Sequence, residues 1–469
     1  MNAAPLRIAY LPFYVDYYEG ICPDFPREKM ALAQQCAKVL AQHGEVVWDG
    51  ELIRDVASAA AIGQKLSAQN VDCVVIVTTI AVFAAIPWAA LQHLGVPILI
   101  WNAQQIERVG KGYSMVEIVR NTGQIGTQAL ANTLLRQGRT FRIITGYRKS
   151  KRTAMELARF FRVLRAAAVL RKARLLSIGA PFPGMVDVEL DRQYLAQHLG
   201  ASAIDLGVED LNRAYAAVPE TEVKKHAKQL KATHKVENLT RDETLRSARL
   251  SEALKALAEG YDVAAGSLNC HGANCLRNEE IGITACYGLG VQNGLGRPFT
   301  CTGDLPTALA MLLLKTLSGA AMYTEVQVMD EKRRAVVIAN SGEGEDALRR
   351  KGCHSIVRGN TNFKGVHGRG ASFAYPLEAG PATIVSLTPT PNHARPFRLI
   401  AAEGEILDEP LPDAGSLAGF FRFAHTDLHD GYTRWLEAGA VHHAGTTSGH
   451  WSREISEVAA LLKMEFVGI

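Results

Sequence analysis

Short apolar runs alternate with amphipathic stretches from Leu6 onward, and this alternation limits the folds open to the chain more than any other feature. The apolar runs cover residues 6–13, 45–48, 72–79 and 96–101, and helix-like stretches separate them. Such an order is typical of βαβ units. The runs lack polar alternation, as expected for parallel strands whose two faces are covered by helices. We therefore expect a doubly wound first domain.

The stretch from Val74 to Leu91 is uncharged and about as long as a membrane span. It contains Pro87 near its end and divides naturally into a strand followed by a helix. Because the same strand-helix rhythm continues on both sides, we interpret it as a buried parallel strand with its crossover helix. No membrane span is expected.

The rhythm passes through a strand at 141–146 and a basic helical stretch at 149–174, then resumes at 173–182. After Gly319 the pattern changes to strand-like runs separated by turns rich in Gly, Pro and Asn. A chain of 469 residues exceeds what one hydrophobic core usually serves. We predict an α/β protein with two doubly wound, Rossmann-like domains, followed by a mostly β C-terminal domain. The predicted bounds are 1–165, 166–320 and 321–469.

The charge balance argues for a small-molecule partner. Lys and Arg number 51 against 47 Asp and Glu, with no long basic run and no acidic tail, so neither nucleic acid nor an anionic membrane is an expected partner. The N-terminal residues lack a charged region followed by a sustained apolar one. We therefore expect a cytoplasmic protein whose eight cysteines are reduced.

Four of these cysteines lie in one segment together with His271. They are Cys270, Cys275, Cys286 and Cys301. Their spacing matches neither a paired CxxC zinc site nor the common iron–sulfur patterns, which favours buried thiols that pack as small apolar side chains. The glycines at 288–296 do not follow the dinucleotide-binding spacing, so a nucleotide cofactor is not expected.

Several segments resemble one enzyme family, the L-fucose and L-arabinose isomerases. The segments are 297–319 (RPFTCTGDLPTALAMLLLKTLSG), 321–326 (AMYTEV), 438–450 (AGAVHHAGTTSGH) and 12–20 (PFYVDYYEG). The resemblance implies the three-domain fold described above and an active site between the central and C-terminal domains. It also implies a homo-oligomer, a trimer or hexamer, in which neighbouring subunits complete each pocket.

The resemblance further implies a metal-assisted aldose–ketose isomerisation through an enediol. In the family, two acidic residues and a histidine hold one divalent cation, usually Mn²⁺, which contacts the oxygens of an open-chain sugar. The second acidic position falls on Glu325, a predicted metal ligand and proton shuttle, and the histidine falls on His443. The first acidic position falls on Thr302, whose neutral hydroxyl can neither balance the metal charge nor act as a base near neutral pH.

Three substitutes for the lost carboxylate are open. Asp304 could reach into the site, Glu343 or Glu345 could take its place, or the substrate could supply a ligand. We predict Asp304 as a catalytic group beside Glu325.

Five further residues are predicted to contact substrate, and they fall into two groups. Tyr14 and Trp88 follow strands of the first domain near the edge where open α/β sheets bind ligands. The other three follow from the resemblance. Asn340 lies near the position of a further histidine in the arabinose branch of the family, and Thr302 and His442 lie at or beside the positions of the predicted metal ligands. Because neighbouring residues of a strand point to opposite faces, at most one of His442 and His443 is expected to bind the metal.

Two other functions remain open. The same scaffold could catalyse a different reaction on a sugar or sugar acid, with Cys301 or Cys270 as nucleophile or proton donor. Alternatively, the chain could bind a sugar without turning it over, and ligand would then stabilise it without a metal requirement.

Overall fold

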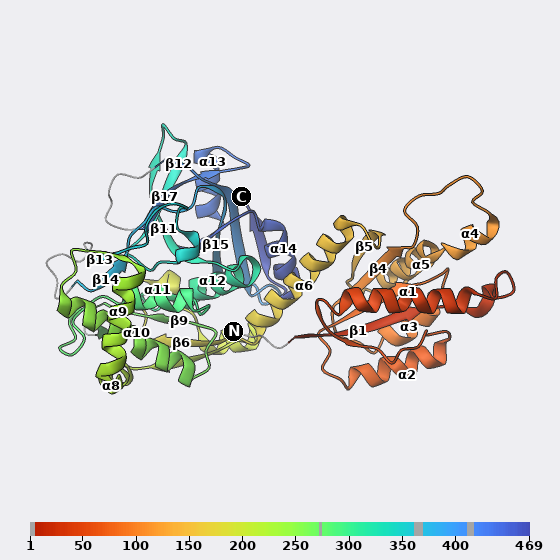
Figure 1. Cartoon of the computed structure of the whole chain (residues 1–469), viewed down its shortest axis with the longest axis horizontal. Helices are drawn as coiled ribbons and strands as arrows, with labels where there is room; N and C mark the ends of the chain where they lie inside the picture. Colours follow the sequence, from red (N-terminus) through yellow and green to blue (C-terminus); the bar gives the residue numbers. More distant parts are fainter. Residues whose placement is uncertain (1–4, 272–273, 361–368, 410–416) are drawn as a thin grey trace. The chain divides into compact units, whose positions relative to one another are not determined.

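The computed structural model describes residues 5–271, 274–360, 369–409 and 417–469 (Figure 1). Its internal contacts divide the chain into two compact units, and the division along the sequence falls between Leu164 and Arg165. The division of the second unit into a central and a C-terminal domain at residues 320 and 321 stays a prediction.

The N-terminal unit is built on a five-stranded sheet in the order β2-β1-β3-β4-β5, in which all neighbours are parallel. The strands are β1 (Leu6–Phe13), β2 (Gly44–Val47), β3 (Cys73–Thr78), β4 (Ile98–Gln104) and β5 (Arg142–Tyr147). The helices are η1 (Asp16–Tyr18), α1 (Phe25–Leu40), α2 (Val56–Ser67), α3 (Ala85–Leu91), α4 (Met115–Arg120), α5 (Gly123–Arg136) and α6 (Lys151–Arg171), the last of which runs across the boundary between the units. The predicted parallel α/β architecture is confirmed.

The uncharged stretch that begins at Val74 forms a strand and a helix, as expected. Every residue of β3 is buried, and α3 follows it. Within the described ranges, no helix is both long and apolar enough to cross a bilayer.

The second unit begins with a four-stranded parallel sheet in the order β10-β9-β6-β7. Its strands are β6 (Arg174–Ile178), β7 (Ser202–Leu206), β9 (Ala265–Leu268) and β10 (Phe299–Cys301). The helices of this part are η2 (Val186–Val188), α7 (Arg192–Leu199), α8 (Val208–Ala217), α9 (Glu220–Thr233), α10 (Arg241–Gly260), α11 (Cys286–Gly294) and α12 (Leu305–Ser318). A small sheet joins β8 (Lys235–Glu237), β13 (Ile356–Gly359) and β14 (Ala371–Phe373).

The rest of the second unit is a barrel of six antiparallel strands. They follow the order β15-β18-β11-β12-β17-β16, and β16 pairs with β15 to close the ring. The strands are β11 (Met322–Asp330), β12 (Ala335–Asn340), β15 (Gly380–Pro389), β16 (Phe397–Ile406), β17 (Leu417–Phe423) and β18 (His443–Ser448), and β19 (Glu465–Gly468) adds to β16 in parallel. The remaining helices are η4 (Asp346–Leu348), α13 (Leu428–Glu437) and α14 (Ser452–Leu461). The predicted β-rich C-terminal region is confirmed.

Helix α12 links the parallel sheet to the barrel, because it packs against β9 and β10 on one side and against β15 and β18 on the other (Figure 1). Its sequence is apolar on nearly all faces, as expected for a helix enclosed by other elements. Asp304 caps its N-terminus, Pro306 lies in its first turn, and Gly319 ends it in the left-handed conformation. The helix therefore holds the turn that contains Asp304 against the barrel.

Candidate metal and active site

Glu325 and His443 face each other across two neighbouring barrel strands. They are direct partners in the antiparallel register of β11 and β18, so their side chains leave the same face of the sheet. Oε1 of Glu325 lies 3.6 Å from Nε2 of His443, which is too long for a hydrogen bond. The His443 side chain is 1% exposed and that of Glu325 is 35% exposed. The pair therefore has a buried imidazole and a carboxylate that solvent can reach.

Asp304 binds the opposite side of the His443 ring. Its Oδ2 atom lies 2.7 Å from Nδ1 of His443, and both side chains are buried. Its Oδ1 atom accepts the backbone N–H of Thr307 at 2.8 Å as the cap of α12. A carboxylate at Nδ1 holds the hydrogen there and leaves the lone pair of Nε2 available to a ligand or cation. Both oxygens of Asp304 are thus engaged in positioning.

Two further residues of β11 hold the Glu325 carboxylate. The Tyr323 hydroxyl donates to Oε1 at 3.2 Å, and the Gln327 side-chain amide donates to Oε2 at 2.6 Å. The Tyr323 ring also lies 4.6 Å from the His443 ring, centroid to centroid. Neither residue was predicted from the sequence, although their spacing of two from Glu325 on a strand places all three side chains on the same face.

Glu343 lies in the loop after β12 and is buried, with its Oε2 atom lacking a hydrogen-bond partner among the described residues. Burial raises the pKa of Glu343 to about 6, and the charge of Glu325 adds to this effect while that of His443 opposes it. The charges of Glu325 and His443 thus both act on the Glu343 carboxyl. A buried carboxyl with a free oxygen is costly unless a cation or a proton is present.

Glu345, the other acidic residue considered in this loop, is already paired. Its carboxylate forms a buried ion pair with Lys315 of α12, whose ammonium also donates to the Asn293 carbonyl at 2.6 Å. Of the two acidic residues of this loop, Glu343 is therefore the one whose carboxylate has an oxygen without a hydrogen-bond partner in the described part of the chain.

Thr302 occupies the turn between β10 and α12 and is buried. Its hydroxyl donates to the Cys301 carbonyl at 2.8 Å, and its φ of +60° lies in the left-handed region. A β-branched residue rarely adopts this conformation outside strained turns. The position that the resemblance assigns to the family's first acidic ligand thus lies in a buried turn and carries no carboxylate.

Asn340 fixes the loop that carries Glu343. Its side-chain amide donates to the carbonyls of Tyr323 at 2.6 Å and Glu343 at 3.2 Å, and its Oδ1 accepts the N–H of Gly342 at 2.8 Å. These contacts engage its polar atoms within the protein. Its predicted contact with substrate stays untested.

His442 lies beside His443, with the two ring centroids 3.7 Å apart. Its Nδ1 atom lies 2.6 Å from Oδ2 of Asp187, which also accepts the His442 backbone N–H at 3.1 Å. Burial opposes ionisation of Asp187, but the contacts with His442 lower the pKa of Asp187 below its usual value. His442 is thus tied to Asp187, whereas His443 is tied to Asp304.

Tyr14 and Trp88 belong to the N-terminal unit. Tyr14 is buried after β1, its hydroxyl donates to Glu19 at 3.2 Å, and the Arg54 guanidinium lies 5.1 Å from its ring centroid. Burial raises the pKa of Tyr14. Trp88 lies within α3 and is partly buried. Their predicted role in substrate binding stays a prediction.

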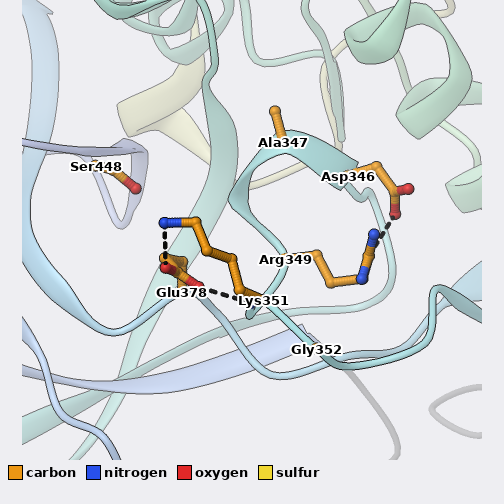
Figure 2. A pocket seen from close by; sticks show the side chains of 7 residues that line it. All are labelled: Asp346, Ala347, Arg349, Lys351, Gly352, Glu378 and Ser448. Atoms are coloured by element: carbon orange, nitrogen blue, oxygen red, sulfur yellow. Dashed lines mark hydrogen bonds and ion pairs between the residues drawn. The ribbon is translucent and has the colours of Figure 1, made fainter.

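Two cavities lie apart from these residues. A cavity of about 510 Å³ in the second unit is lined by Asp346, Ala347, Arg349, Lys351, Gly352, Glu378 and Ser448. Figure 2 shows that its charged side chains are paired with each other, Lys351 with Glu378 and Arg349 with Asp346. The other cavity, of about 160 Å³, lies in the N-terminal unit around the end of β4 and includes Asn102, Gln104 and Tyr113. That edge is where open α/β sheets bind ligands.

The four clustered cysteines are buried and free, as expected. The hydrogen bond with the Cys270 thiol, followed by burial, raises the pKa of Cys301 well above its usual value. An activated cysteine nucleophile requires a lowered pKa. The thiol is thus not prepared for nucleophilic attack.

Comparisons with known proteins found two matches. Residues 322–465 match the family described as L-arabinose isomerase C-terminal domain. The L-arabinose isomerase of Acidothermus cellulolyticus is 25% identical over 346 residues, which cover 70% of this chain and 66% of that relative. The match thus spans slightly less than two thirds of the relative's length. The resemblance inferred from the sequence is confirmed: the chain is a distant relative of the L-arabinose isomerases and carries their C-terminal domain over residues 322–465.

Proposed function

We propose that the protein is an aldose–ketose isomerase that acts on an open-chain sugar and uses a divalent cation, with Mn²⁺ the best candidate. The observation that carries the proposal is the arrangement around His443. Its Nε2 atom faces Glu325, its Nδ1 atom is held by Asp304, and its charge, like that of Glu325, acts on the buried carboxyl of Glu343. The relationship to the L-arabinose isomerases supports the same chemistry.

The side-chain types of Glu325, Glu343 and His443 suit a divalent cation, although their ligand atoms do not all lie within 4.8 Å of one another, so an ion would have to draw them together. Among the described residues, the Oε2 atom of buried Glu343 has no hydrogen-bond partner, and a cation would supply one. Two carboxylates and one imidazole form a donor set that suits Mn²⁺. Glu325, Glu343 and His443 would hold the ion, and Glu343 would thereby replace the carboxylate that the family has at the position of Thr302.

When bound, the cation would polarise the sugar oxygens and acidify the C–H next to the carbonyl. Glu325 is the group that solvent and substrate can reach, so we assign to it the transfer of the proton between C1 and C2. The hydrogen bonds from Tyr323 and Gln327 hold its carboxylate in place. Asp304 acts as a positioning residue, because both of its oxygens are already bound.

Metal analysis of the full chain tests the proposal. The protein is stripped with chelator, reloaded with Mn²⁺ and compared with Glu325→Gln, Glu343→Gln and His443→Ala. We expect one ion per chain in the unmodified protein and a loss of at least tenfold in affinity in each variant. Glu378→Gln, which alters an acidic residue of the separate cavity in Figure 2, is the control and should bind normally. Absence of stoichiometric Mn²⁺ from the unmodified protein would overturn the metal site.

Turnover is tested with L-arabinose and L-fucose in deuterium oxide. An enediol route exchanges the C2 hydrogen with solvent, which proton NMR detects even when little ketose accumulates. We expect exchange only with metal present. Stabilisation by sugar with neither exchange nor a metal requirement would instead support the sugar-binding alternative.

We also propose that the protein acts in the cytoplasm as a homo-oligomer, a trimer or hexamer. An exposed aromatic pair in the N-terminal unit supports an interface there. Tyr17 is 72% exposed and Phe83 is 55% exposed, with their ring centroids 6.1 Å apart. Light scattering should give an oligomer for the unmodified chain and smaller species for Tyr17→Ser with Phe83→Ser. A monomer at micromolar concentration would contradict this part of the proposal.

A further inference from the structure

A second cluster of donor atoms lies at the edge of the central parallel sheet. Cys301 is the last residue of β10, and Cys270 lies two residues beyond the end of β9. These strands are parallel neighbours, with Cys301 opposite Leu268. The carboxyl ends of both strands therefore bring the two thiols to the same edge of the sheet, although 30 residues separate them in the sequence.

The donor atoms are close together. The Sγ atoms of Cys270 and Cys301 lie 3.4 Å apart, and the nearest donor atom of His271 completes a set whose members all lie within 4.8 Å of one another. The His271 imidazole interacts with the Cys301 thiol, and its ring packs edge-on against Phe182. We propose that Cys270, His271 and Cys301 bind a second metal ion, of the zinc type, separate from the ion assigned to Glu325 and His443.

The spacing of the donors agrees with zinc. With Zn–S bonds of about 2.3 Å and Zn–N bonds of about 2.0–2.1 Å, sulfur ligands of a tetrahedral ion lie roughly 3.8 Å apart. The observed Sγ–Sγ distance of 3.4 Å needs only a small change to reach this value. Two thiolates and one imidazole prefer zinc, whereas the carboxylate-rich set around Glu325 prefers manganese. Three protein ligands also leave a fourth position for water or another ligand.

The turn after β9 is held in place by its own hydrogen bonds. Asn269 donates from its side chain to the Ala180 carbonyl at 2.8 Å and accepts the His271 N–H at 3.2 Å. The Asn274 side chain donates to the Asn269 carbonyl at 2.8 Å. A metal site gains affinity when such contacts fix its ligands in advance. Two of the three proposed ligands, Cys270 and His271, thus lie on a turn that hydrogen bonds hold in place.

Cobalt is the probe for this site, because Co²⁺ bound to thiolate absorbs in the near ultraviolet. The chelator-treated full chain, kept reduced, is titrated with Co²⁺ and then with Zn²⁺ or Mn²⁺. We expect one equivalent of Co²⁺ to produce the thiolate band, Zn²⁺ to remove it, and Mn²⁺ to leave it. The band should persist in His443→Ala, which separates this proposal from the proposed isomerase site.

The variants Cys270→Ser and Cys301→Ser should each lose the thiolate band. Cys73→Ser is the matched control, because Cys73 is equally buried but lies on β3 in the N-terminal unit. The titration of the unmodified chain decides the question if a variant fails to fold. Absence of the band in that titration would overturn the proposal. So would a band that survives in both folded variants, or a Cys270–Cys301 disulfide in protein purified under reducing conditions.

Discussion

Nδ1 of His443 lies 2.7 Å from Oδ2 of Asp304, and this contact joins strand β18 of the barrel to the N-terminus of helix α12. The same carboxylate caps the helix through its other oxygen. One buried side chain therefore stabilises the helix end and sets the tautomer of the imidazole. A substitution of Asp304 therefore affects the end of α12, the His443 ring, or both.

Asp304→Asn is expected to weaken Mn²⁺ binding without removing it. The amide offers a single oxygen, so it can cap α12 or accept from His443 but cannot do both. Loss of such a supporting contact lowers metal affinity roughly 10–100-fold. Isothermal titration with Mn²⁺ measures the change.

Asp427→Asn is the matched control for this prediction, since Asp427 caps α13 through the Asp430 N–H and lies on a different helix. It should leave Mn²⁺ affinity unchanged. Equal affinity of Asp304→Asn and the unmodified protein would show that the contact with Asp304 does not prepare His443 for the metal.

The fold was accessible from the sequence because burial on both faces of a strand leaves a continuous apolar run. β3 is the clearest example, with all six residues buried. The pairing of β15 with β16, which closes the barrel, could not be predicted from the sequence. It depends on pairing between strands, and turn-bounded apolar runs do not specify that pairing.

The site was predicted only in part, for a physical reason. Glu325 and His443 are found by resemblance to the family. Among the described residues, Glu343 has a buried oxygen without a partner, whereas Glu345 is paired with Lys315. This difference depends on the course of the loop after β12. The sequence could not decide which of the two acidic residues replaces the lost carboxylate, because the loop is fixed by a contact of Asn340 with an atom that is distant in the chain. Likewise, the spacing of Cys270 and Cys301 in the sequence does not indicate that their thiols lie side by side.

Glu343 should make the metal-free protein less stable as the pH rises. Its folded pKa of about 6 exceeds the usual 4.5, because burial disfavours the charged form. The raised pKa contributes stability below pH 4.5, and this contribution is lost as the pH rises through 6. Glu343→Gln cannot ionise, so it should be more stable than the unmodified protein above pH 6 by about 2 kcal/mol. Below pH 4.5 the difference should vanish. Urea unfolding in chelator across this pH range measures it.

Glu345→Gln is the comparison variant, because it should lower the free energy of unfolding where Glu343→Gln should raise it. It breaks the buried ion pair with Lys315, which should cost about 3–5 kcal/mol near neutral pH. A destabilised Glu343→Gln above pH 6 would contradict the assignment of a free, buried carboxyl to Glu343.

Thr302→Glu should introduce a carboxylate at the position that the resemblance assigns to the family's first acidic ligand. Because Thr302 is buried, the new charge should destabilise the metal-free protein by several kcal/mol. Saturating Mn²⁺ should recover this loss, giving a larger rise in Tm than the unmodified protein shows. Thr302→Gln has nearly the same size without the charge and should show no such gain. Equal metal-induced shifts in both variants would place residue 302 outside the metal site.

Gly303→Ala should disturb the turn that places Asp304. Gly303 has a φ of +86°, and an added Cβ would lie 2.5 Å from the Cα atom of Pro181, which is backbone and cannot give way easily. Gly319, at the other end of α12, has a φ of +91° with no atom within 4 Å of an added Cβ. Gly319→Ala therefore bears only the conformational cost, about 1 kcal/mol, whereas Gly303→Ala bears that cost and a steric one. We expect Gly303→Ala to have the lower Tm and to bind Mn²⁺ more weakly, while Gly319→Ala keeps the affinity of the unmodified protein. If both variants bound Mn²⁺ equally well, the position of Asp304 would not depend on the packing of this turn against Pro181, and His443 would have to be held by other contacts.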